Sequence, residues 1–269
     1  MKTKFDKLLT YILFSLFLFA SGSLCSGQKK QDGKEASKPG MPQLSQEKLD
    51  SLRKVFDNRL RNDWAYMEKY AEENQKLPPV SPDEKRVVFM GNSITEGWTT
   101  HDPDFFSKNK SFINRGIGGQ TTPQMLVRFR NDVINLNPSL VVILAGTNDI
   151  AGNTGPTTLE NIYGNIISMA ELAKANNIKV ILCSVLPVYE YPWSPGLEPA
   201  EKIVGLNAML HSYAKKNNVD YVDFHSAMSD DRNGMKAEYS DDGVHPNIEG
   251  YKVMDKLIEK SIHETLNIK

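Results

Sequence analysis

Four short stretches of the chain carry residue types that could perform acyl transfer. In chain order they are residues 91–97 (GNSITEG), 115–122 (RGIGGQTT), 146–149 (GTND) and 241–247 (DDGVHPN). Together they hold a hydroxyl, a glycine pair, a side-chain amide and a carboxylate shortly before a histidine. Such a reaction needs a nucleophile, a base with an orienting group, and donors for an oxyanion.

Each of these groups would have a defined part in that chemistry. The Ser93 hydroxyl is a weak nucleophile at neutral pH and needs a base, for which His245 is the candidate. Asp242 can share a tight turn with His245 and hold the imidazole in the required tautomer. The backbone N–H groups of Ser93 and Gly119 and the side-chain amide of Asn148 are candidate oxyanion donors.

Taken singly, most of these stretches also have a structural explanation. Ser93 could cap a helix, residues 117–120 (IGGQ) most often form a plain turn, and residues 146–149 fit turn chemistry. A lone histidine at a helix start, such as His245, is more often structural. The presence of all four stretches in this order favours a functional site.

The intervening sequence predicts an α/β fold. Short apolar runs alternate with helical stripes, and the candidate strands are residues 86–90, 111–114, 140–145, 179–186 and 220–224. Near-continuous apolar strands separated by helices are typical of a mostly parallel sheet covered on both faces. Since ligands bind outside the carboxyl ends of such strands, we expect the four stretches to converge there.

The N-terminal third predicts export and a separate helix. Residues 1–26 combine a basic start, a short apolar run and small residues, which is typical of a secretory signal peptide. Cleavage predicts a periplasmic or extracellular protein, with lipidation at Cys25 as an alternative. Residues 27–46 predict a disordered linker. Beyond the linker, apolar residues recur at steps of three and four, which predicts an amphipathic helix over 47–77. This helix could pack on a catalytic domain at 80–269 or bind a partner.

Composition narrows the classes of partner. The 269 residues include 32 basic and 33 acidic side chains, for a net charge of -1, so no positive field attracts nucleic acid. Of the two cysteines, Cys25 lies in the predicted signal peptide, so no structural disulfide with Cys183 is expected. No metal-ligand spacing such as His-Glu-x-x-His occurs.

The four stretches resemble those of the SGNH hydrolases, also called the GDSL-like lipase/acylhydrolase superfamily, from about residue 85 to the end. The resemblance implies a flavodoxin-like three-layer α/β/α fold with a five-stranded sheet, without metal or organic cofactor. It implies that Ser93 is the nucleophile, Gly119 and Asn148 are oxyanion donors, and Asp242 and His245 complete the triad. Asn92 stands where the family usually has Asp. This replacement retains the capacity for hydrogen bonding but removes the negative charge.

Two further stretches could line a substrate pocket, residues 98–106 (WTTHDPDFF) and 189–196 (YEYPWSPG). Tentative substrate contacts are Asn92, Trp98, Tyr191 and Trp193, although the aromatic rings could also merely cover the sheet. Because no long apolar lid occurs, we expect a short acyl ester, especially an acetyl ester of a carbohydrate. The alternatives are a lysophospholipid or platelet-activating-factor-type ester, or a non-catalytic secreted binding module. The natural ester and the oligomeric state stay open.

Overall fold

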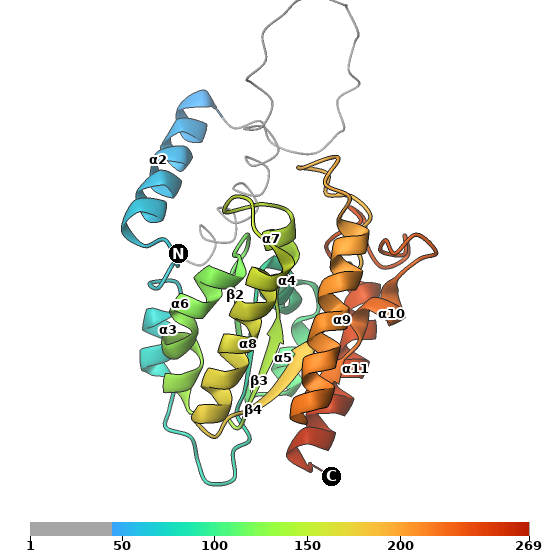
Figure 1. Cartoon of the computed structure of the whole chain (residues 1–269). Coiled ribbons are helices and arrows are strands. Elements are labelled where there is room, and N and C mark those ends of the chain that lie inside the picture. The colour runs from blue at the N-terminus through green and yellow to red at the C-terminus, as the bar shows by residue number, and fades with distance from the viewer. Residues whose placement is uncertain (1–44, 269) are drawn as a thin grey trace, which may run out of the picture. The chain divides into compact units, whose positions relative to one another are not determined.

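The computed structural model describes residues 45–268, which belong to two compact units divided after Asp63. The predicted signal peptide, Cys25 and nearly all of the predicted linker lie outside the described residues. The first unit contains the helix α2 (Gln46–Asn62), drawn in blue in Figure 1. Its N-terminus is capped by the Ser45 side chain, which accepts a hydrogen bond from the backbone N–H of Lys48.

The helix predicted over 47–77 is interrupted. After α2 the chain makes turns, and a second helix, α3 (Ala71–Lys76), begins eight residues after Asp63. Tyr66, in the interruption, has a φ of 55°, in the left-handed region that a right-handed helix cannot include. Residues 64–77, called the strap below, belong to the second unit, which therefore begins before the boundary at residue 80 predicted from the sequence.

The second unit is built on a five-stranded parallel sheet, as predicted. Its strands are β1 (Val87–Gly91), β2 (Phe112–Gly116), β3 (Leu140–Leu144), β4 (Lys179–Cys183) and β5 (Asp220–Val222), in the order β2-β1-β3-β4-β5. β4 is shorter than predicted because, beyond Cys183, the backbone N–H and carbonyl of Val185 hydrogen-bond the Asn207 side chain. β5 likewise ends at Val222, before the predicted residue 224.

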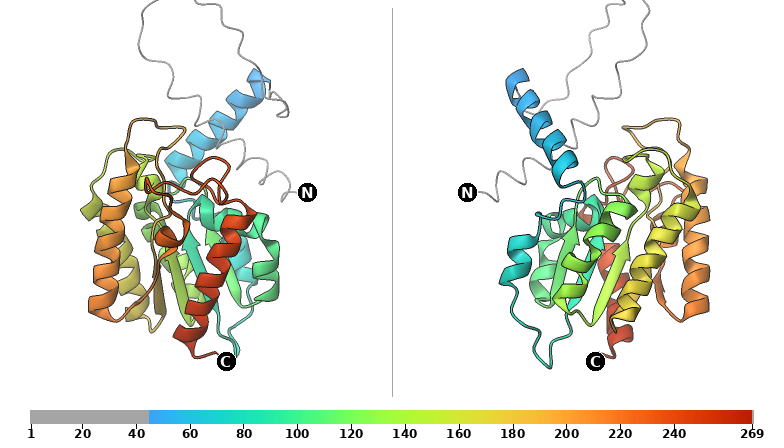
Figure 2. Two further views of the ribbon diagram at one scale, coloured as in Figure 1. Left: turned by 90° about the vertical axis from the view of Figure 1, so that its right-hand side faces the viewer. Right: turned by 60° about the vertical axis from the view of Figure 1, so that its left-hand side comes forward.

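Helices cover both faces of the sheet and complete the three layers, which confirms the predicted fold class (Figures 1 and 2). One face packs against α6 (Thr122–Asp132), α8 (Leu159–Ala175) and α9 (Pro199–Asn217). The other packs against α4 (Ser93–His101), α5 (Pro103–Lys108), α10 (Phe224–Met228) and α11 (Ile248–Leu266). The short α7 (Thr147–Ile150) and the 3-10 turn η1 (Ile134–Leu136) lie in connections.

The strand register brings the polar stretches to one edge. Gly91 pairs with Gly116 on β2 and with Leu144 on β3, so three strands end side by side. A Cβ atom on Gly91 would lie 2.0 Å from the Oγ1 of Thr95, and one on Gly116 would lie 2.2 Å from the backbone nitrogen of Glu96. Glycine at both strand ends therefore lets α4 pack directly on the sheet.

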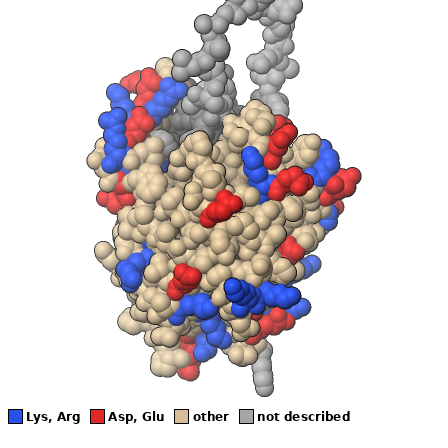
Figure 3. All heavy atoms as spheres, in the orientation of Figure 1, with Lys and Arg blue, Asp and Glu red and all other residues tan. Residues whose placement is uncertain are grey.

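On the face drawn in Figure 3, acidic and basic side chains are interspersed around a largely uncharged middle. This agrees with the net charge of -1. Within residues 45–268, none of the helices has both the length and the apolar character required to cross a bilayer.

Candidate active site

The structure brings Ser93, His245 and Asp242 into one hydrogen-bonded line. The Oγ of Ser93 lies 3.0 Å from the Nε2 of His245, although the two residues are 152 positions apart. The Nδ1 of His245 lies 2.8 Å from the Oδ2 of Asp242. If Nδ1 donates its proton to the carboxylate, Nε2 is left able to accept the proton of the serine hydroxyl.

Ser93 is presented by the turn from β1 into α4, where it is the first helical residue. Asn92 caps this helix, because its side-chain oxygen accepts a hydrogen bond of 3.0 Å from the N–H of Ile94. Asn92 is 1% exposed. The uncharged amide thus performs the capping that an aspartate would perform, and it has no surface for the tentatively predicted contact with substrate.

Asp242 is held by its own turn. Its Oδ1 accepts the backbone N–H groups of Val244 and His245, at 2.8 Å and 2.7 Å. The hydroxyl of Ser240 accepts the N–H of Gly243 and lies 2.7 Å from the carbonyl oxygen of His245. Burial raises the pKa of Asp242, but the hydrogen bonds and charge of His245 outweigh it, so the pKa lies well below its usual range. The group facing His245 is therefore a carboxylate at neutral pH.

Of the three predicted oxyanion donors, Ser93 follows β1, Gly119 lies on the loop after β2, and Asn148 lies on α7 after β3. Gly119 has a φ of 76°, which glycine permits, and no neighbouring atom lies within 4 Å of the position that a Cβ would take. The side-chain nitrogen of Asn148 donates a hydrogen bond of 2.9 Å to the carbonyl oxygen of Gln120. Because an amide nitrogen carries two hydrogens, this bond fixes the plane of the group and leaves its second N–H for another acceptor.

The three predicted aromatic contacts have different positions. Trp98 is 1% exposed and stacks on Phe105, 5.3 Å between ring centroids, so it belongs to the core rather than to the pocket. Tyr191 is fully buried, and its hydroxyl donates to the carbonyl oxygen of Thr147 at 2.9 Å. Trp193 is the one of the three that is only half-buried, and its ring centroid lies 6.1 Å from that of His245. Tyr191 supports this ring from behind, at 5.2 Å.

Sequence reasoning missed two side chains that hold the loop after β2, the half-buried Glu96 and the buried Arg128. Glu96, one turn after Ser93, accepts the N–H of Gly118 at 2.7 Å and pairs with Lys69 at 3.0 Å. Arg128 on α6 hydrogen-bonds the side chain of Gln120 at 2.5 Å. A signal existed for Arg128, since it stands three residues after Met125, on the stripe of α6 that faces the core.

A further buried side chain that sequence reasoning missed lies directly after Asn148 in the chain. The carboxylate of Asp149 accepts the backbone N–H of Thr122 and its hydroxyl, the latter at 2.6 Å. Burial raises the pKa of Asp149 to about 6, although the hydrogen bonds from Thr122 oppose the shift. Asp149 therefore ties the start of α6 to α7, the short helix that carries Asn148.

Comparison with known proteins agrees with this architecture. Residues 89–253 match the family model described as the GDSL-like lipase/acylhydrolase family. The crystal structure of a GDSL-like lipase from Bacteroides thetaiotaomicron is 51% identical, with a TM-score of 0.73, and the match covers 75% of this chain and 99% of that one.

Two curated relatives are more distant. Platelet-activating factor acetylhydrolase IB subunit alpha2 of Rattus norvegicus is 26% identical over 72% of this chain and 85% of that protein. An acetylxylan esterase of Xylanibacter ruminicola is 25% identical over 70% of this chain, and the match spans only 45% of the esterase. With the family model covering more than half of its residues, the chain belongs to the GDSL-like lipase/acylhydrolase family and is a carboxylic ester hydrolase.

Proposed function

We propose that Ser93 is the nucleophile of this ester hydrolase, that His245 is its general base and that Asp242 orients the imidazole. The observation that carries the proposal is the hydrogen-bonded line from Ser93 through His245 to Asp242, at 3.0 Å and 2.8 Å. The N–H groups of Ser93, Gly119 and Asn148 are the donors for the oxyanion, since all three lie at neighbouring strand ends.

The reaction proceeds through an acyl-enzyme. As the Oγ of Ser93 attacks the ester carbonyl, the Nε2 of His245 accepts its proton, and the carbonyl oxygen becomes an oxyanion. The imidazolium returns this proton to the departing alkoxide, which leaves as the alcohol. Water then attacks the acyl group with His245 again as base, and the carboxylate product and free Ser93 are released. Asp242 stabilises the imidazolium in both halves.

The substrate that we propose is a short acyl ester, most simply an acetyl group on a carbohydrate. The half-buried ring of Trp193 beside His245 could stack on a sugar ring, and Tyr191 holds the loop that carries it. An acetylxylan esterase is among the relatives, which supports this choice. The second candidate, an acetyl ester of a phospholipid, is favoured by the similarity to the platelet-activating factor acetylhydrolase subunit.

Labelling with a fluorophosphonate tests the nucleophile. The wild-type protein should be labelled, and Ser93→Ala should abolish both the label and turnover, with kcat falling by roughly 10⁴–10⁶-fold. Ser107→Ala, which removes an exposed hydroxyl on α5, is the matched control and should retain both. A wild-type protein without label or turnover would instead identify a non-catalytic binding module.

A substrate panel tests the acyl group and the alcohol. Nitrophenyl esters of increasing chain length should show the highest kcat/KM for acetate, and acetylated xylan should be deacetylated. Trp193→Ala should raise KM for the acetylated carbohydrate but not for methyl acetate, because the methyl ester offers no ring to stack on the indole. Preference for a lysophospholipid or for a platelet-activating-factor-type ester over acetylated carbohydrate would favour the lipid alternative.

We also infer that the protein is exported to the periplasm or the cell exterior, on the strength of the predicted signal peptide at residues 1–26. Mass spectrometry of the mature N-terminus tests this. A start near residue 27 without lipid supports secretion, a diacylated Cys25 supports anchoring, and an uncleaved Met1 contradicts both.

A further inference from the structure

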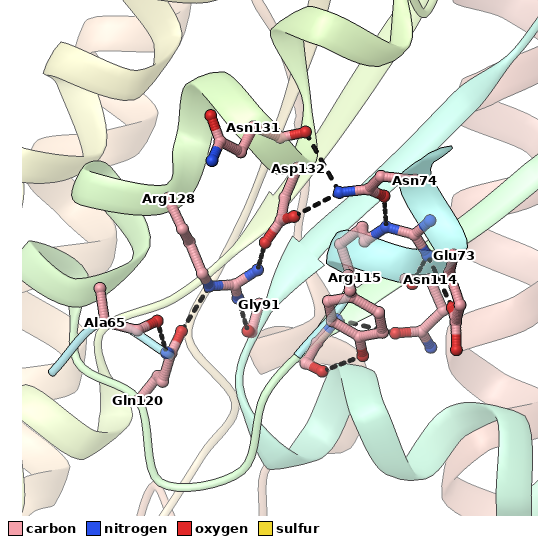
Figure 4. A network of polar contacts seen from close by, with 12 residues as sticks. Ala65, Glu73, Asn74, Gly91, Asn114, Arg115, Gln120, Arg128, Asn131 and Asp132 are labelled. Atoms are coloured by element: carbon pink, nitrogen blue, oxygen red, sulfur yellow. Dashed lines mark hydrogen bonds and ion pairs between the residues drawn. The ribbon is translucent and has the colours of Figure 1, made fainter. Parts of the chain in front are cut away.

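A fully buried guanidinium, that of Arg128, lies against the loop that follows β2 (Figure 4). The three nitrogens of Arg128 donate to three acceptors: the Oε1 of Gln120 at 2.5 Å, the Oδ2 of Asp132 at 2.9 Å and the carbonyl oxygen of Gly91 at 3.1 Å. A buried charge is tolerated only when it is paired and hydrogen-bonded, and Asp132 supplies the pair. The remaining two bonds reach Gly91, at the end of β1, and Gln120, next to Gly119.

Gln120 is held at three points. Its side-chain oxygen accepts from Arg128, and its side-chain nitrogen donates to the carbonyl oxygen of Ala65 in the strap at 2.7 Å. Its backbone oxygen accepts from the Asn148 side chain at 2.9 Å. The first two bonds fix the residue in place, and the third transmits its position to the amide of Asn148.

The strap closes the network from the other side. The side chain of Asn74 bridges Asp132 and Arg115, at 2.8 Å and 2.9 Å (Figure 4). The hydroxyl of Tyr70 donates to the carbonyl oxygen of Gly116 at 2.5 Å. The strap lies outside residues 89–253 that match the family model. Its contacts nevertheless hold the two ends of the loop from Gly116 to Gln120.

We propose that Gln120 is a positioning residue, which orients the Asn148 amide toward the oxyanion because Arg128 and the strap carbonyl of Ala65 hold it in place. This inference depends on the proposed acyl transfer at Ser93. Catalytic donors must be aligned to within tenths of an ångström, and a displacement of 1 Å can lower a rate about 100-fold. Gln120 meets this demand without touching the substrate, since its own polar groups all face protein partners.

The first experiment compares Gln120→Leu with a matched control, Gln124→Leu, in nitrophenyl acetate hydrolysis. Gln124 is also buried, lies one helical turn later and donates to a strap carbonyl, that of Trp64 at 2.8 Å, but has no bond to Asn148. Both variants should lower the melting temperature. Gln120→Leu alone should lower kcat by about 10–100-fold with KM unchanged within about threefold. Equal losses of kcat in the two variants would overturn the proposal.

The second experiment is a double-mutant cycle with Asn148→Ala. If Gln120 acts through the Asn148 amide, Gln120→Leu should lower kcat by less than about threefold once that amide is absent. An undiminished loss would overturn the proposal and assign Gln120 a purely structural role. If Gln120→Leu does not fold, Gln120→Glu replaces it in the cycle. The glutamate carboxylate can still accept the hydrogen bond from Arg128, but it cannot donate one to the carbonyl oxygen of Ala65. Wild-type kcat in Gln120→Glu would then count against the proposal.

The controls separate this inference from the proposed function. Absence of Ser93-dependent turnover in the wild-type protein would contradict the acyl transfer itself. Ser93-dependent turnover with an unaffected kcat in Gln120→Leu would contradict only the positioning role.

Discussion

On one face of β1, Phe89 packs against Trp98 and Phe105, whereas beyond the end of the strand the guanidinium of Arg128 hydrogen-bonds the carbonyl oxygen of Gly91. The first region is an aromatic cluster in which Phe89 meets Trp98 at 5.7 Å between ring centroids, at 74°. The second is a polar network whose members are joined by directed hydrogen bonds (Figure 4). Both regions are buried, and both contact β1, the strand that precedes Ser93.

The two regions differ in how precisely they fix the positions of their atoms. Apolar burial is roughly proportional to area and does not depend on direction, so an aromatic cluster stabilises the fold but tolerates small shifts of its members. A hydrogen bond weakens steeply with misalignment, so a polar network fixes individual atoms. We therefore expect the aromatic cluster to determine stability and the Arg128 network to determine the geometry of the candidate active site.

The largest effect that tests this difference between the two regions is expected from substitution of Arg128. Arg128→Met leaves the Asp132 carboxylate buried without its cation and should cost about 3–5 kcal/mol of unfolding free energy. In Arg128→Met/Asp132→Leu most of that stability should return, while kcat stays low because Gln120 and Gly91 still lack their donor. Urea unfolding and nitrophenyl acetate kinetics measure the two quantities. If the double variant recovers kcat together with stability, the network serves stability alone.

At the aromatic cluster the opposite pattern is expected. Trp98→Ala should lower the free energy of unfolding by about 3–5 kcal/mol, because it removes a buried indole and its hydrogen bond to Asp255. The kcat of the folded fraction should stay within about threefold of wild type. Trp98→Phe, which keeps a ring, is the matched control and should lose less stability. A large fall in kcat at unchanged fraction folded would contradict the division between the regions.

The parts of the molecule that could be predicted from the sequence are those governed by periodicity and by sheet geometry. β1 and β3 are buried on every residue, so they read as continuous apolar runs. Since parallel strands end at one edge, the order of the polar stretches sufficed to predict that Ser93 and His245 would meet. The 3.0 Å separation of Ser93 Oγ and His245 Nε2 agrees with that expectation.

The parts that could not be predicted depend on direction rather than on residue type. Trp98 follows Ser93 by five positions, which turns it about 140° around α4, away from the nucleophile and into the core. Apolar residues continue at helical spacing through the strap and therefore predict one helix. In the structure, Ala65 and Tyr70 are buried but lie in turns, and Tyr66 has a positive φ. The spacing of Arg128 from Met125 places it on the core-facing stripe of α6, but the sequence does not show which acceptors its guanidinium meets there.

A carboxyl with a raised pKa lies beside each region, the buried Asp149 near the polar network and the half-buried Asp255 next to the aromatic cluster, and their pH dependence extends the comparison. Burial raises the pKa of Asp149 to about 6, and burial likewise raises the pKa of Asp255, which accepts the Trp98 hydrogen bond, to about 7. A carboxyl whose pKa is higher in the folded than in the unfolded state holds its proton more tightly when folded. Such a carboxyl therefore contributes most to the free energy of unfolding at low pH. That contribution declines as the pH rises from the pKa of the unfolded state to the pKa of the folded state.

The smallest expected effect follows for Asp149. Between about pH 4 and pH 6, the wild-type protein should lose roughly 3 kcal/mol of unfolding free energy relative to Asp149→Asn, at about 1.4 kcal/mol per pH unit, and the difference should be constant above about pH 7. Urea unfolding of both proteins from pH 4 to pH 8 measures it, and the subtraction removes the contribution of Asp255 and of Asp242. Parallel stability curves would mean that Asp149 titrates alike in both states. In that case the bonds from Thr122 fully offset its burial, and the polar region carries no net electrostatic strain at neutral pH.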